Sequence, residues 1–157
     1  MLFLNIFVLA QSDKSSVKVI IISKAGKNRV CTNKEGEILL RVSIQNIKKF
    51  KKNGLVHYSD LGAKGDGKTD DMDAIVATHA FANKYKLSVK ADSRHTYYIS
   101  GKSRSAIIKT DTDFGTANFI IDDTNVQNIK TNVFMVKSEL IPFDINGIYT
   151  LKKIKKN

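Results

Sequence analysis

The feature that most constrains the fold is the second half of the chain, where short β-type runs alternate with polar turns. Asp, Asn, Gly and Thr fill the gaps between these runs. No second amphipathic helix appears among them, so an alternating βαβ architecture is not supported. The pattern favours stacked β layers, and it does not separate a solenoid from a sandwich. The predicted runs are 88–90, 97–100, 106–109, 117–121, 133–137 and 147–151.

One helix is predicted over residues 71–86. Apolar residues and a histidine recur there at helical spacing: Met72, Ile75, Val76, His79 and Ala80. Thr69 or Asp70 offers a side-chain oxygen for the N-cap, and Asp71 and Asp73 complement the helix dipole in the first turn. Lys84 and Lys86 place positive charge at the C-terminal end, where the dipole favours it.

Residues 11–53 are predicted to form a small β-rich segment before the main fold. The run 17–22 is β-branched, and 29–32 is expected to return beside it as a hairpin partner. Another strand is predicted over 37–44. A short helix through Ile44, Ile47 and Lys48 is the alternative for the following basic stretch.

The opening decapeptide, Met1 to Ala10, is uncharged and nearly all apolar. With small side chains before Gln11, it is typical of the apolar region and cleavage site of a signal peptide, although a charged n-region is absent. This pattern predicts a secreted or periplasmic protein. The run is too short to span a bilayer, so no stable membrane span is expected. A first β-strand is the alternative interpretation.

Positive charge exceeds negative charge by a wide margin, with 26 Lys and Arg against 15 Asp and Glu. The excess favours acidic partners such as an acidic polysaccharide. The clusters over 48–52 and 152–156 indicate nucleic acid only weakly, and we predict no nucleic-acid partner. A single cysteine, Cys31, excludes an internal disulfide and any multi-cysteine zinc site.

The loop 62–69, Gly-Ala-Lys-Gly-Asp-Gly-Lys-Thr, matches the spacing of a phosphate-binding loop between a strand and a helix. In that interpretation Lys68 reaches phosphates and Thr69 contacts a magnesium ion. Asp66 within the loop would place negative charge beside a polyphosphate, and the preceding residues 56–59 are too polar for a buried central strand. Nucleotide binding is therefore the weakest alternative.

The fuller string from Tyr58 to Asp71, followed by Ala74-Ile75, resembles the N-terminal segment of the pectate lyase-like superfamily. Weaker similarity continues through 90–92 and 96–99 and ends near residue 137. The resemblance implies a mainly β fold, the start of a right-handed parallel β-helix with one N-terminal capping α-helix over about 70–86. Residues 54–157 would hold this cap and the first turns.

Within this motif the glycines permit positive φ, and the aspartates can accept hydrogen bonds from loop amides. The helix would then cover the open end of the stack. We therefore assign a structural role, as loop and helix cap, to Gly62, Gly65, Asp66, Gly67, Asp70 and Asp71.

Candidates for chemistry are few. The acids considered are Asp111, Asp113, Asp122, Asp123 and Asp144. The adjacent pair Asp122-Asp123 is typical of a strand-ending turn as much as of a catalytic pair, because neighbouring strand residues point to opposite faces. Tyr97 and Tyr98 are candidate carbohydrate contacts. The histidines lack metal-ligand spacing, so no metal and no cofactor is predicted, with calcium open if the protein is a lyase.

Stacked β turns need several layers and a terminal cover, and the basic ending 151–157 offers none. We therefore expect a truncated chain whose catalytic residues are missing. The predicted function is the N-terminal portion of an exported, carbohydrate-active β-helix protein, either a glycoside hydrolase or a lyase of pectin-like polymers. A non-catalytic module for glycan binding or adhesion is the alternative.

Overall fold

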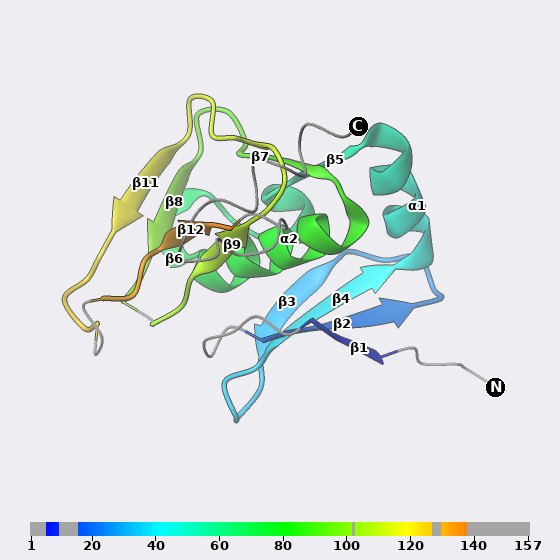
Figure 1. Cartoon of the computed structure of the whole chain (residues 1–157), viewed down its shortest axis with the longest axis horizontal. Coiled ribbons are helices and arrows are strands. Elements are labelled where there is room, and N and C mark those ends of the chain that lie inside the picture. The colour runs from blue at the N-terminus through cyan, green and yellow to red at the C-terminus, as the bar shows by residue number, and fades with distance from the viewer. Residues whose placement is uncertain (1–5, 10–15, 102, 127–129, 138–157) are drawn as a thin grey trace, which may run out of the picture.

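The computed structural model describes residues 6–9, 16–101, 103–126 and 130–137. Within that part of the chain the protein is α/β, with two α-helices and four small sheets (Figure 1). Helix α2 (Met72–Tyr85) lies in the middle of the molecule. The blue and cyan strands lie on one side of it, and the green to orange strands lie on the other.

The N-terminal sheet has the strand order β1-β2-β4-β3. Its strands are β1 (Ile6–Leu9), β2 (Val17–Ile22), β3 (Arg29–Thr32) and β4 (Ile38–Ser43). β2 runs parallel to β4, whereas β1 and β3 are antiparallel to their neighbours. Alternate residues of β2 and β4 are buried, as the period of a strand requires. The hairpin predicted between 17–22 and 29–32 is wrong, because β3 pairs with β4.

Helix α1 (Ile44–Asn53) follows β4 directly and bears out the helical alternative for this stretch. The hydroxyl of Ser43 caps it by accepting a hydrogen bond from the Asn46 amide at 3.1 Å. Gly54 ends it with a φ of 66°, a conformation that glycine adopts without strain. Ile47 and Phe50 face inward, and the Phe50 ring meets Phe81 of α2 edge-on at 6.0 Å between centroids.

Three further sheets contain only parallel pairs. The first has the order β10-β7-β5, the second β11-β8-β6 and the third β12-β9. Their strands are β5 (Leu55–His57), β6 (Asp66–Asp70), β7 (Ser88–Lys90), β8 (Thr96–Ile99), β9 (Ala106–Ile108), β10 (Thr112–Asp113), β11 (Asn118–Ile121) and β12 (Phe134–Val136). A short 3-10 helix, η1 (Ser59–Leu61), joins β5 to the loop before β6.

Helix α2 is buried on nearly every side. Every residue from Ala74 to Ala82 is buried, and the helix contacts strands of the N-terminal sheet as well as β5, β7 and β9. A helix packed on two sides needs apolar or small residues all round, which Ala74, Ala77 and Ala82 supply. The predicted single apolar stripe therefore describes only part of the buried surface of this helix.

The β-helix prediction is wrong. The structure has small parallel sheets of two or three strands, an additional mixed sheet and two helices, and it contains no solenoid among the described residues. Helix α2 is not a lid over an open stack, because the N-terminal sheet covers its other side. The turn-rich second half of the chain does form short parallel strands, as its pattern indicated. That pattern did not indicate that β1–β4 and α1 form a separate layer against α2.

Several predicted elements occupy their expected places, including residues 17–22, 29–32 and 88–90. Strand β6 was missed because its residues, Asp-Gly-Lys-Thr-Asp, have the composition of a loop. Part of the opening decapeptide forms β1, which pairs with β2. Export through residues 1–10 stays a prediction, and the strand predicted at 147–151 lies outside the described residues. No described helix is long and apolar enough to cross a membrane.

Candidate functional site

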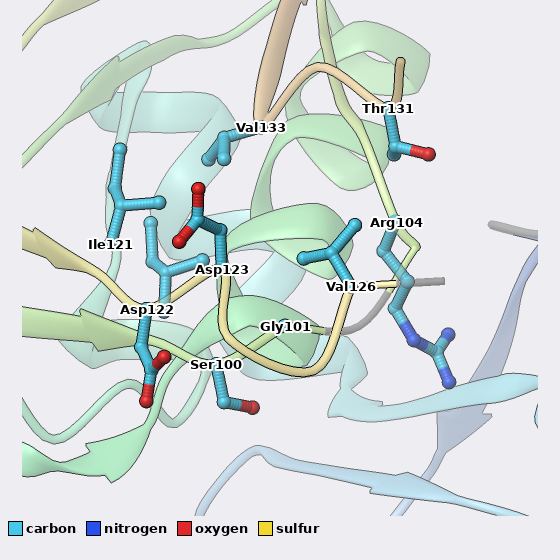
Figure 2. Close-up of a pocket in the computed structure, with 10 residues that line it drawn as sticks. Ser100, Gly101, Arg104, Ile121, Asp122, Asp123, Val126, Thr131 and Val133 are labelled. Carbon is cyan, nitrogen blue, oxygen red and sulfur yellow. The ribbon is translucent and has the colours of Figure 1, made fainter. Parts of the chain in front are cut away.

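A pocket of about 190 Å³ opens where β8 and β11 end and the chain approaches β12 (Figure 2). Its walls combine aliphatic side chains with polar ones. The lining residues are Ile99, Ser100, Gly101, Arg104, Ile121, Asp122, Asp123, Val126, Thr131 and Val133. Parallel pairing places the ends of β8 and β11 side by side, which is why Ile99 and Ile121 meet at this point.

Asp122 is held in place by its neighbours. Its carboxylate accepts a hydrogen bond from the Tyr98 hydroxyl at 2.6 Å and others from the hydroxyl and amide of Thr124. The Thr124 hydroxyl, followed by Tyr98, lowers the pKa of Asp122. The hydrogen bond between Tyr98 and Asp122 also raises the pKa of Tyr98. Asp122 is therefore ionised at neutral pH and serves as a fixed acceptor.

Asp123 lies next to it but faces the other way. Figure 2 shows the two carboxylates pointing in opposite directions, as neighbouring residues of an extended chain do. Asp123 is exposed. The pocket therefore presents the exposed carboxylate of Asp123 beside apolar residues such as Ile121 and Val133, whereas the half-buried Asp122 is bonded to Tyr98 and Thr124.

The guanidinium of Arg104 does not point into the pocket. In Figure 2 it points away from both carboxylates and toward the N-terminal sheet. Its Nε lies 3.0 Å from Oδ1 of Asp73 on α2, and it donates to the carbonyl of Gly36 at 2.9 Å. Its side chain is only 10% exposed, so this pair ties α2 to the turn between β3 and β4.

The aspartates of the predicted loop all accept hydrogen bonds from within the protein. Asp66 accepts from the amides of Lys68 and Thr69, and these bonds lower the pKa of Asp66 to about 2. Asp70 accepts from the Met72 amide and from the hydroxyl of Ser100 at 2.6 Å. The N-cap of α2 is Asp71, whose side chain does not cap the helix.

Asp71 instead organises the glycine-rich bend. The residue is 1% exposed, and its carboxylate accepts from the amides of Lys64 at 2.6 Å and Gly65 at 2.9 Å. Burial raises the pKa of Asp71, although these two amides act in the opposite direction. Gly62, Gly65 and Gly67 have positive φ. At Gly65 a Cβ atom would lie 2.5 Å from the His95 ring, so the site also requires a residue without a side chain.

This geometry argues against phosphate binding in the loop. A phosphate-binding loop directs its backbone amides at the ligand. Here the amides of Lys64, Gly65, Lys68 and Thr69 donate to carboxylates of the same loop. A phosphate would have to displace the buried Asp71 to reach the Lys64 and Gly65 amides, and the exposed Asp66 to reach those of Lys68 and Thr69.

Tyr97 and Tyr98 have different surroundings. Tyr97 is fully buried, and its hydroxyl donates to Asp92 at 2.7 Å. Tyr98 points to the other face of β8 and is half-buried beside Ser100 and Asp122. Of the two predicted carbohydrate contacts, Tyr98 is therefore the one that a ligand can reach.

Ser59, His57 and Asp92 also come together without forming a catalytic triad. The Ser59 hydroxyl donates to Asp92 at 2.6 Å, and Nδ1 of His57 lies 3.6 Å from the same carboxylate. In a triad the histidine stands between the serine and the acid, whereas here the acid stands between them. Burial alone would raise the pKa of Asp92, but the hydrogen bonds from Ser59 and Tyr97 outweigh it and the pKa falls.

His79 lies inside the core. Its Nε2 is 2.8 Å from the Tyr58 hydroxyl, and burial lowers the pKa of His79 to about 4. The described residues contain no cluster of three or more acids, histidines or cysteines that could hold a metal. Of the other predicted acids, Asp113 pairs with Lys90 at 3.3 Å, Asp111 is exposed before β10, and Asp144 lies outside the described residues.

Sequence reasoning missed Ser100, Val126, Thr131 and Val133 as neighbours of Asp123. The only available signal was that Ser100 ends one predicted strand and Asp122 follows another, and the parallel pairing that joins those strand ends was not known. No protein-family profile, curated protein or solved structure matches this chain. The resemblance to the pectate lyase-like superfamily is therefore contradicted, since the α/β architecture does not support it either.

Proposed function

We propose that the protein is a carbohydrate-binding module whose pocket takes a neutral or amino sugar. The observation that carries the proposal is the combination, in one small pocket, of aliphatic walls with the exposed carboxylate of Asp123. Tyr98 does not line the pocket, and its hydroxyl donates to Asp122, whose carboxylate points away from that of Asp123.

A sugar ring suits such a lining. Its C–H faces are apolar and its hydroxyls are donors, so one ligand can bury a ring face against Ile121, Val126 and Val133 while donating to a carboxylate. Ionised carboxylates accept strong hydrogen bonds. A purely apolar ligand would leave Asp123 desolvated without a partner, which is costly.

Binding fits the geometry better than hydrolysis. A glycosidase needs two carboxyl groups facing one glycosidic bond across about 5 to 9 Å. Asp122 and Asp123 point apart, and Asp122 is already bonded to Tyr98 and Thr124. Hydrolase or lyase activity of a longer protein stays a prediction, and the geometry of this pocket does not support it.

The pocket also changes the expected ligand. The net charge of +11 favours acidic polymers, but the positive charge is not located here. A uronate carboxylate brought beside Asp123 would be repelled, and the repulsion would weaken as salt is added because Asp123 is exposed. Uronic acids should therefore bind the pocket less well than neutral sugars, and amino sugars better.

The test is a titration of the ¹⁵N-labelled protein with short neutral, amino and uronic oligosaccharides, followed by NMR. We expect shifts confined to residues 98–101, 121–126 and 131–133, with affinity falling from amino to neutral to uronic sugars. Asp123→Asn should weaken amino-sugar binding at least tenfold. Asp111→Asn removes an exposed carboxylate elsewhere and should leave the affinity unchanged.

An absence of shifts with all three sugar classes would refute the proposal. Equal loss in Asp123→Asn and Asp111→Asn would show that only the net charge matters. A preference for simple alkylamines without hydroxyls would replace the sugar with a cationic ligand.

A further inference from the structure

Strand β11 has one side without a partner in the described part of the chain. It pairs with β8, and the amides of Asn118 and Asp122 donate to the carbonyls of His95, just before β8, and of Ile99. In a parallel ladder the alternate residues point their backbone groups the other way. The N–H and C=O groups of Phe119 and Ile121 therefore face outward, at the margin of the molecule in Figure 1.

This edge lacks the usual protection against strand pairing. Its residues are Asn118-Phe119-Ile120-Ile121, with no proline and no charged side chain. Ile120 is 45% exposed and Ile121 is 55% exposed. β11 is also longer than the neighbouring edge strands β10 and β12. An apolar edge of this kind is a site of strand addition.

We propose that β11 is a self-association edge through which two copies of this chain pair antiparallel about a twofold axis at Ile120. The outward-facing residues Phe119 and Ile121 are equally spaced from Ile120, so Phe119 of each copy can exchange both backbone hydrogen bonds with Ile121 of the other. The two Ile120 side chains then lie opposite each other as a non-hydrogen-bonded pair.

The flanking residues match in the same register. Asn118 comes opposite Asp122 of the other copy, so an amide donor meets a carboxylate and like charges are not placed together. Asn118, Ile120 and Asp122 share one face of the strand. Because the motif is self-complementary, a second copy fits it without any further sequence requirement.

The interface shares Ile121 and Asp122 with the pocket. It follows from the backbone register of β11, and its test uses no sugar. Sedimentation velocity of the purified full chain over a range of concentrations should show a monomer–dimer equilibrium, with the dimer at twice the 17.5 kDa chain mass. Ile120→Lys should abolish the dimer, because two ammonium groups would be brought together.

Ile44→Lys is the matched control. Ile44 is 41% exposed on α1, close to the exposure of Ile120, and the substitution adds the same charge away from β11. It should leave the equilibrium unchanged. A monomer at every concentration, or a dimer that persists in Ile120→Lys, would overturn the proposal. The first of these outcomes would indicate that another part of the chain covers the edge.

Cross-linking tests the register separately. In a Cys31→Ser background, Ile120→Cys should oxidise to a disulfide dimer, because Cα atoms of such an opposed pair lie about 4.5 Å apart. Val136→Cys on β12 is the comparison, since Val136 is 80% exposed and lies outside the register. Equal cross-linking of both variants would mean random collision and would contradict the twofold pairing.

Discussion

The N-terminal sheet and the parallel sheets are stabilised in different ways. β2 and β4 are six residues long, pair in unbroken register and bury alternate aliphatic side chains. The parallel strands are two to five residues long, and β6 pairs with β8 through a register shift. Around them, carboxylates bind the backbone of neighbouring segments. Asp70 reaches Ser100, Asp71 reaches Lys64, and Asp92 reaches Ser59.

The difference shows how short strands can be kept in place. A long strand gains its stability from apolar burial that repeats every second residue. A strand of three residues gains little in this way, so side-chain bonds to loop amides must fix the connections between strands. We therefore expect the two regions to respond to different substitutions.

The largest effect is expected in the N-terminal sheet. Leu40→Ala removes a fully buried side chain from the centre of β4 and should lower the free energy of unfolding by about 3 kcal/mol. Urea denaturation followed by circular dichroism measures it. Leu39→Ala, on the less buried face of the same strand, is the control and should cost less. Equal losses would mean that alternate burial does not stabilise this sheet.

Removing one carboxylate among the three parallel sheets should lower the free energy of unfolding nearly as much. Asp71→Ala leaves the Lys64 and Gly65 amides without their acceptor and should cost about 2.5 kcal/mol. Hydrogen exchange should show these two amides losing protection. Asp113→Ala, which removes a half-exposed carboxylate paired with Lys90, should cost under about 1 kcal/mol. If Asp71→Ala left the free energy of unfolding unchanged, carboxylate bonds would not be what stabilises the parallel sheets.

His79 should make stability depend on pH, because it lies where α2 faces the parallel region. Its folded pKa, about 4, lies below the unfolded value, so the unfolded state binds more protons between these values. Its stabilising contribution is complete above about pH 6.5 and falls as the pH drops toward 4. We expect a loss of about 2 kcal/mol at pH 5.

The measurement is the unfolding free energy at pH 7.5 and pH 5, with His79→Phe as the comparison. This variant loses the bond to Tyr58 but carries no titrating group, so its stability should change less between the two pH values. An identical pH profile in both proteins would show that His79 is not the group responsible.

The smallest effect is expected at the first helix. Ser43→Ala removes the cap of α1 and should cost about 1 kcal/mol. Thermal unfolding measures the change, and Ser43→Asp should restore most of it, because Asp is also a good N-cap. A loss in Ser43→Asp as large as that in Ser43→Ala would indicate that burial of the Ser43 hydroxyl, which is 1% exposed, matters more than capping.

Much of the secondary structure could be predicted because its signals are local. The run Val-Lys-Val-Ile-Ile-Ile predicts a strand through β-branching. Spacing and first-turn acids predict a helix over 71–86, and the observed helix covers Met72–Tyr85. Strand β6 escaped because only its pairing with β8 makes Asp-Gly-Lys-Thr-Asp extended. The hairpin 17–32 was wrong because strand patterns do not specify partners.

The candidate site was less predictable. Asp122 and Asp123 were noticed, and their divergence follows from the strand period alone. Their neighbours Ser100 and Val133 are distant in sequence and come together only because β8, β11 and the approach to β12 end at one place. Tyr97 and Tyr98 were predicted as a pair, yet the pleat of β8 buries Tyr97 and leaves Tyr98 half-buried.

By itself, the sequence determined where helix α2 and several strands begin and end, because capping, β-branching and turn formation act over a few residues. It also located three of the glycines that have positive φ, namely Gly62, Gly65 and Gly67. The tertiary structure alone decided that the N-terminal sheet covers α2, that the parallel strands form small separate sheets, and that Asp123 borders a pocket. Those outcomes depend on which apolar surfaces meet across the chain, and that choice follows from the packing of the whole molecule and not from any local pattern.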